Sequence, residues 1–193
     1  MDLVLIRHAR PERIEGASGP ADPDLTDLGH RQADAMAKWI ADEHFDALYV
    51  SPMARARQTA APLEQALGLT AGVVPGVQEF DAEENHYIPL EDFRENKEEW
   101  RRFLAEQVER DMSDFAEVVR SSIESVIGDH RGHRVGIICH GGVINVWAAA
   151  VLGLGPGMFF NPDYTSINRF AAASSGERSV VSLNETSHLR GID

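Results

Sequence analysis

The chain has 193 residues, of which 43% are hydrophobic and 25% charged, and this balance predicts one globular domain over residues 1–193. The net charge of −13 repels nucleic acids and anionic membranes, so we exclude both as partners and expect any anion site to be a local cluster of positive groups. The single cysteine, Cys139, predicts a reducing, cytoplasmic location. The first apolar run, residues 3–6, is too short for a signal peptide, and no later run is long enough to predict a transmembrane helix.

The first part of the chain alternates an apolar run with a helical spacing. Residues 2–7 predict a buried strand, and the proline- and glycine-rich residues 10–27 predict a loop. Apolar residues at helical spacing predict a helix over residues 28–43, with Thr26 as its N-cap. Residues 47–50 predict a second buried strand.

Ser51-Pro52 opens a second predicted helix, with the serine as its cap and the proline in its first position, which runs to about residue 67. Residues 72–80 predict a short third strand. Residues 81–112 carry eleven acidic against five basic side chains and predict a solvated helical segment.

The second half of the chain continues the alternation with a helix, a strand, a helix entered through His140, and two strands, over residues 113–127, 134–139, 141–152, 167–173 and 179–183. Alternating strands and helices predict the α/β class with a mostly parallel sheet. Ligands of such sheets bind beyond the carboxyl ends of the strands. Four segments follow predicted strands and are expected to converge there: Arg7-His8, residues 51–57, Glu79 and His140-Gly141-Gly142.

His8 is the candidate nucleophile, because a neutral imidazole can attack phosphorus and form a covalent phosphohistidine. The neighbouring Arg7 suits a phosphoryl group, since the guanidinium fork matches its oxygens. His140 also follows a buried strand, and Gly141 and Gly142 let a phosphate approach the backbone at a helix N-terminus. These residues together predict a phosphoryl site.

Two further residue types would complete such a site. Arg55 and Arg57 lie in the first turns of a predicted helix, where they oppose the helix dipole, so a bound anion would compensate. A leaving alkoxide needs a proton, which a carboxyl of raised pKa can supply. The residue types alone leave four acidic candidates for this role: Glu79, Asp81, Glu83 and Glu84.

No histidine spacing typical of a metal site occurs, so we expect neither a metal ion nor an organic cofactor. Asp22 and Asp24 could hold a cation, but the flanking prolines and Thr26 favour a turn and a helix cap.

The chain resembles the histidine phosphatase superfamily, also called the phosphoglycerate mutase-like family, in four blocks whose order and spacing are specific only together. The blocks are Arg7-His8-Ala9, where the family has Arg-His-Gly; residues 25–33 (LTDLGHRQA); residues 51–60 (SPMARARQTA); and His140-Gly141-Gly142. The resemblance implies a three-layer α/β/α sandwich, with residues 81–112 at the place of a substrate-cap insertion.

The resemblance also implies roles. His8 would be the phosphorylated nucleophile, and the phosphoryl oxygens would be bound by Arg7, Arg55 and His140, with Gly141 and Thr26 assigned to the same group. An acidic residue after the third strand would be the general acid and then the base. We prefer Glu79 to Glu84 here, because Glu79 stands at a predicted strand end whereas Glu84 lies in a solvated charged run.

The predicted function is a metal-independent phosphatase that hydrolyses a small phosphate monoester. Residues 81–112 offer few basic groups for a second phosphate, which favours hydrolysis over mutase action. Two alternatives stay open: a phosphoglycerate mutase-type phosphotransferase and a non-catalytic member that binds a phosphorylated ligand. A homodimer is compatible with all three.

Overall fold

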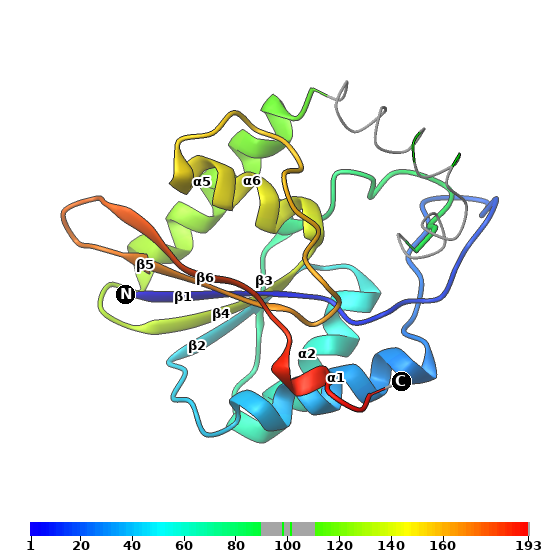
Figure 1. Ribbon diagram of the computed structural model, residues 1–193, viewed down its shortest axis with the longest axis horizontal. Helices are drawn as coiled ribbons and strands as arrows, with labels where there is room; N and C mark the ends of the chain where they lie inside the picture. Colours follow the sequence, from blue (N-terminus) through cyan, green and yellow to red (C-terminus); the bar gives the residue numbers. More distant parts are fainter. Residues whose placement is uncertain (90–97, 99–100, 102–110, 193) are drawn as a thin grey trace.

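The computed structural model describes residues 1–89, 98, 101 and 111–192, and its strands form a sheet in the order β3-β2-β4-β1-β5-β6 (Figure 1). The parallel strands are β1 (Asp2–Arg7), β2 (Ala47–Val50), β3 (Gly72–Val73) and β4 (Arg134–Cys139). An antiparallel pair completes one side of the sheet, β5 (Ile167–Ala172) and β6 (Arg178–Glu185). The predicted α/β class with a mostly parallel sheet is confirmed.

Helices cover both faces of this sheet (Figure 1). They are α1 (Asp27–Ile40) and α2 (Ala54–Leu67) on one face, and α5 (Ser113–Asp129) and α6 (Gly141–Leu152) on the other. Side chains of a strand point alternately to the two faces, so Val4 and Ile6 pack with the first pair while Leu3 and Leu5 pack with the second. This double cover explains the unbroken apolar runs of β1 and β4 and confirms the three-layer arrangement.

Two expected boundaries are wrong by three residues or more. The helix α1 ends at Ile40 rather than at residue 43. The third strand holds only Gly72 and Val73, because Pro75 has no amide hydrogen for a further ladder bond and instead opens the 3-10 turn η1 (Pro75–Val77). Glu79 therefore follows a turn and does not stand at a strand end.

The start of α2 also differs from the prediction. The helix begins at Ala54 with Met53 in the cap position, so Ser51 and Pro52 precede it. The Ala54 amide donates to both carboxylate oxygens of Asp22, at 2.9 Å each. An aspartate at a helix N-terminus is favourable, and Asp22 takes the capping role expected of Ser51.

Residues 81–89 form turns and an extended stretch, not the expected helix. Ile14 and Tyr87 exchange both backbone hydrogen bonds, at 2.9 and 2.8 Å, which joins this stretch to the loop after β1. Most of the expected cap insertion over residues 81–112 lies outside the described residues. Within the part of the chain that is described, no helix has both the length and the apolarity needed to cross a membrane.

Candidate active site

The carboxyl ends of β1, β2 and β4 bring the predicted phosphoryl-binding residues together. Arg7 ends β1 and His8 follows it, α2 after β2 carries Arg55, and His140 follows β4. All four side chains are buried, with exposed fractions of 6%, 2%, 1% and 0% for Arg7, His8, Arg55 and His140. Burying two arginines and two histidines at the carboxyl ends of these strands costs hydration free energy, so their placement points to a function other than stability.

His8 is oriented for attack by one nitrogen. Its Nδ1 lies 2.8 Å from the Ala9 carbonyl, which can only accept, so Nδ1 carries the hydrogen and Nε2 keeps its lone pair. Burial lowers the pKa of His8 well below its ordinary value, and the charges of Arg55 and Arg7 lower it further. The imidazole is therefore neutral near neutral pH, which is the state a nucleophile needs.

His140 lies beside His8, with 5.1 Å between the ring centroids. Its Nε2 is 2.8 Å from the Ser51 hydroxyl, which also accepts the Met53 amide at 3.4 Å. Ser51 can therefore donate to Nε2 and leave the hydrogen on Nδ1, for which the described residues supply no partner. Burial, then Arg55, keeps the pKa of His140 well below its ordinary value, so this ring acts as a neutral donor. Ser51, which the sequence analysis assigned to helix capping, therefore contacts His140.

The two arginines are each stacked on a tyrosine. The Arg7 Cζ atom lies 4.1 Å from the Tyr164 ring centroid, and Arg55 Cζ lies 4.8 Å from that of Tyr87. Arg7 Nη1 also donates to the Pro162 carbonyl at 2.6 Å. The Nε and Nη1 atoms of Arg55 are buried without a hydrogen-bond partner among the described residues. Buried donors are normally satisfied, so these hydrogens fit the oxygens of an anionic ligand.

Glu79 reaches the same edge from the turn after η1. Its Oε2 accepts the Gly142 amide at 3.0 Å and its Oε1 accepts the Phe80 amide at 3.2 Å. Desolvation, followed by the charge of Asp81, raises the pKa of Glu79 to about 7. A carboxyl that is half protonated near neutral pH can give a proton to a leaving group and take one back from water.

Gly142 makes the position of Glu79 possible. A Cβ atom on Gly142 would lie 2.2 Å from Glu79 Oε1 and 2.7 Å from Phe80 Cδ1, both inside contact distance. The second glycine of the His-Gly-Gly block thus leaves room for the carboxyl. The sequence analysis expected both glycines to leave room for a phosphate. Gly141 can still do so, since a Cβ atom there would lie 3.7 Å from Arg7 Nε.

The sequence profile of the histidine phosphatase superfamily (branch 1) matches residues 3–186. The chain belongs to this superfamily. It is 26% identical over 197 residues to a phosphoserine phosphatase of Hydrogenobacter thermophilus, covering 97% of this chain and 93% of the relative. It is 25% identical to a "Probable phosphoglycerate mutase" of Yersinia enterocolitica, covering 81% and 77%. Its fold matches the phosphoserine phosphatase of Entamoeba histolytica solved with phosphoserine, with a TM-score of 0.75, 23% identity, and 97% and 98% of the chains covered.

Other predicted residues of this histidine phosphatase superfamily member lie apart from the site or serve the fold. The Thr26 hydroxyl caps α1 by accepting the Gly29 amide at 2.9 Å, and it donates its hydrogen to the Arg10 carbonyl at 3.1 Å. The cap prediction is confirmed, whereas phosphate binding by Thr26 stays a prediction that these contacts do not support. Arg57 and Glu84 are exposed, and Glu84 offers its carbonyl to the Ala21 amide at 2.7 Å.

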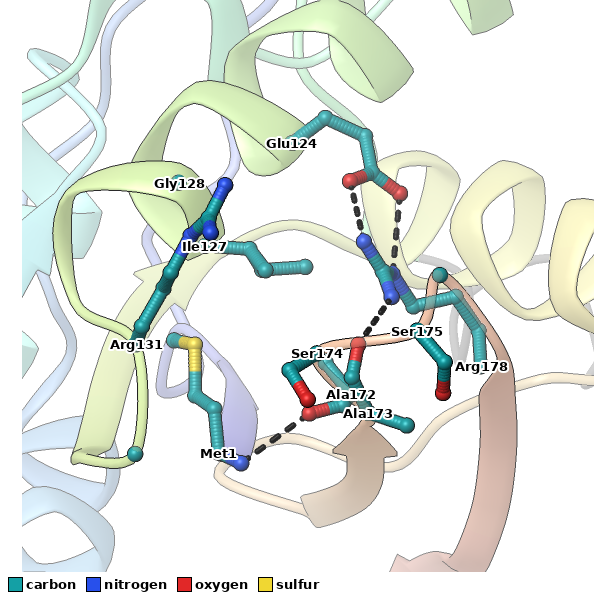
Figure 2. Close-up of a pocket in the computed structure, with 12 residues that line it drawn as sticks. Met1, Glu124, Ile127, Gly128, Arg131, Ala172, Ala173, Ser174, Ser175 and Arg178 are labelled. Carbon is teal, nitrogen blue, oxygen red and sulfur yellow. Dashed lines mark hydrogen bonds and ion pairs between the residues drawn. The ribbon is translucent and has the colours of Figure 1, made fainter.

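A separate cavity of about 470 Å³ lies at the amino ends of β1 and β4, where Met1 precedes β1 and Arg131 precedes β4 (Figure 2). Its charged lining is largely self-satisfied, since Arg178 Nη2 donates to Glu124 Oε2 at 2.6 Å and the terminal amine donates to the Ala172 carbonyl at 3.0 Å. It holds neither a histidine nor a cysteine. In the described ranges, no three His, Cys, Asp or Glu side chains are grouped to hold a metal ion.

Proposed function

We propose that this protein is a phosphatase that hydrolyses a small phosphate monoester through a phosphohistidine on His8. The observation that carries the proposal is the neutral His8 imidazole, oriented by the Ala9 carbonyl and placed with two buried guanidinium groups. Arg7 and Arg55 supply two positive charges, which balance a phosphate dianion. The names of relatives, phosphoserine phosphatase among them, support a small phosphorylated metabolite as the substrate.

The first step transfers the phosphoryl group to the protein. The lone pair on His8 Nε2 forms the N–P bond while the ester O–P bond breaks, and the protonated Glu79 gives its hydrogen to the leaving oxygen. The released product is the alcohol. The positive charge that develops on the imidazole is stabilised by the Ala9 carbonyl, which accepts the Nδ1 hydrogen throughout.

The second step restores the protein. Ionised Glu79 takes a proton from a water molecule as the water oxygen attacks phosphorus, and the N–P bond breaks with its electrons returning to Nε2. Inorganic phosphate leaves. The arginines and the His140 donor hold the equatorial oxygens in both steps, so the proposal uses no metal ion or organic cofactor. We place the reaction in the cytoplasm, because the single cysteine suits a reducing compartment.

The test is turnover of p-nitrophenyl phosphate and release of inorganic phosphate from a panel of phosphorylated metabolites. We expect His8→Ala to abolish both, and His44→Ala, a change at an exposed ring near Asp46, to alter neither. Label from a ³²P substrate should appear on wild-type His8 as an acid-labile, base-stable adduct. Full activity of His8→Ala would refute the proposal.

Two further measurements separate the alternatives. Vanadate should compete with substrate because it mimics five-coordinate phosphorus, and a chelator should not inhibit. Loss in chelator with recovery by one divalent metal would exclude the mechanism above. Efficient interconversion of 2- and 3-phosphoglycerate would favour the mutase reading, and ligand binding without any turnover would favour the non-catalytic one.

A further inference from the structure

Two carboxylates flank the buried guanidinium of Arg55. Asp22 Oδ1, from the loop after β1, lies 3.7 Å from Arg55 Nη1, and Asp81 Oδ1, from the turn after η1, lies 4.0 Å from Nη2. Both distances are too long for hydrogen bonds, so the carboxylates do not take up the arginine hydrogens that would bind a phosphoryl group. Their side chains are 43% and 31% exposed, whereas that of Arg55 is 1% exposed. The carboxylates therefore stand on the solvent side of the phosphoryl site.

The charges of the inner site are already balanced when a substrate binds. A phosphate dianion is matched by Arg7 and Arg55, and burial keeps both His8 and His140 neutral by lowering their pKa. A charged group elsewhere on the substrate therefore interacts with residues outside the set formed by Arg7, His8, Arg55 and His140. There Asp22 and Asp81 contribute two negative charges.

In the proposed mechanism, Asp81 lies near the leaving group. Glu79, which protonates the leaving oxygen in the proposed mechanism, is two residues away, and the charge of Asp81 contributes to the raised pKa of Glu79. Asp81 is thus close to both the phosphoryl ligand Arg55 and the proton donor. In the proposed mechanism, the alcohol portion of a substrate lies next to these two groups.

Asp22 is held in place before any substrate arrives. Both of its carboxylate oxygens accept the Ala54 amide at 2.9 Å, at the first turn of α2. The Tyr87 ring covers Arg55 and makes a T-shaped contact with the His8 ring, with 6.4 Å between the two ring centroids. A carboxylate held at the solvent side of Arg55 favours a cation there over a second anion.

We infer that Asp22 and Asp81 select the leaving group by charge, so that the preferred substrates are small phosphate monoesters whose alcohol carries an ammonium group. Esters whose alcohol carries a carboxylate or a second phosphate are disfavoured by the same two charges. The inference rests on the proposed phosphatase function. The net charge of −13 acts in the same direction, because it attracts cationic molecules and repels anionic ones at long range.

The experiment uses three two-carbon phosphate esters that differ in one terminal group: phosphoethanolamine with an ammonium, 2-hydroxyethyl phosphate with a hydroxyl, and phosphoglycolate with a carboxylate. For the wild type we expect kcat/KM to fall in that order, by about tenfold or more from the first to the last. The esters differ in intrinsic reactivity. The decisive quantity is therefore the ratio of kcat/KM for the ammonium ester to kcat/KM for the carboxylate ester, compared between wild type and variant, because intrinsic reactivity cancels in that comparison.

The variants are Asp22→Asn and Asp81→Asn, which remove a charge at nearly constant volume. Asparagine at position 22 can still accept the Ala54 amide, so α2 keeps its cap. Each variant should lower the ammonium-to-carboxylate ratio by about tenfold and change the hydroxyl ester least. The control Asp42→Asn makes the same change in net charge at an exposed turn beyond the far end of α1, and it should leave the ratio unchanged.

Calorimetric binding of the same three esters to His8→Ala reads the preference without turnover. Two results together would overturn the inference alone: both aspartate variants keep the wild-type ammonium-to-carboxylate ratio of kcat/KM, and the three esters bind to His8→Ala with equal affinity. The wild type would then still hydrolyse p-nitrophenyl phosphate. Charge-dependent binding without hydrolysis of any ester would support the inference and refute the proposed phosphatase function.

Discussion

Two of the regions in which arginine and glutamate side chains lie together shift the pKa of the glutamate in opposite directions. In the Glu43 network, formed by Glu43, Arg134, Arg169 and Glu185, the Arg169 guanidinium donates to both Glu43 oxygens at 2.7 and 2.8 Å and to Glu185 at 3.1 Å. The hydrogen bonds from Arg169 lower the pKa of Glu43. Each charge in the network has a partner of opposite sign at contact distance, so the network serves stability.

The phosphoryl site arranges the same residue types differently. Arg55 is more deeply buried than Arg169, yet its nearest carboxylates lie at 3.7 and 4.0 Å. The pKa of Glu79 is raised to about 7, mainly by desolvation, where that of Glu43 is lowered. The difference fits the proposed mechanism, in which Arg55 binds a ligand and Glu79 exchanges a proton, at the expense of stability.

The largest expected effect distinguishes the two candidates for the general acid, Glu79 and Glu84. Glu79→Gln should slow hydrolysis of an alkyl phosphate by about a hundredfold to ten-thousandfold and that of p-nitrophenyl phosphate less, because a good leaving group needs no proton. Glu84→Gln, at an exposed side chain, should change both little. If the leaving-group-dependent loss appears in Glu84→Gln alone, the two roles are exchanged.

The arginines test the comparison directly. Arg55→Met should lower kcat/KM for p-nitrophenyl phosphate by about a hundredfold to a thousandfold, with an unfolding free energy that is unchanged or raised. The reason is that an apolar side chain replaces a buried cation whose Nε and Nη1 atoms have no hydrogen-bond partner among the described residues. Arg169→Met should keep the activity and lower the unfolding free energy by about 1–3 kcal/mol. Urea denaturation and steady-state kinetics measure both. Equal losses of stability in the two variants would remove the distinction.

A smaller effect is expected from the glycine that makes room for Glu79. Gly142→Ala should cost about tenfold to a hundredfold on alkyl phosphates, because the new Cβ atom displaces the Glu79 carboxyl. Gly128→Ala, where a Cβ atom meets nothing within 4 Å, is the matched control and should retain full activity. A Gly142→Ala enzyme as active as the control would show that the carboxyl need not occupy this position.

The smallest effects concern stability against pH. The raised pKa of Glu79 gives a contribution that is fully present below its ordinary value of 4.5 and is lost as the pH rises through about 7. Glu79→Gln should therefore gain about 3 kcal/mol over the wild type near pH 8 and almost nothing near pH 4.

Glu43 should respond in the opposite direction, because its pKa is lowered in the folded state. Its contribution is present at neutral pH and is lost as the pH falls through the folded-state pKa. Glu43→Gln should cost about 1–2 kcal/mol at neutral pH and less in acid. Denaturation curves of both variants across pH check the pair, and parallel pH profiles would contradict it.

Much of the fold and part of the site could be predicted from local sequence. The apolar runs of β1 and β4 can only be buried strands covered on both faces, and a parallel sheet brings the residues after such strands to one edge. That rule was sufficient to place Arg7-His8, residues 51–57 and His140 together, and the family blocks singled out Arg55 from Arg57. Prediction of the third strand failed because Pro75 ends the ladder, which an apolar pattern does not report.

The sequence by itself determined where β1, β2 and β4 run and which residues follow them, because an apolar run and its end are read within a few neighbouring residues. Only the tertiary structure decided that Glu79 is seated against the Gly142 amide, that Ser51 holds His140, and that Asp22 caps α2. These pairs are separated by 63, 89 and 32 residues. A hydrogen bond or a desolvated carboxyl depends on what the folded chain brings within a few ångströms, and that proximity leaves no local pattern in the sequence.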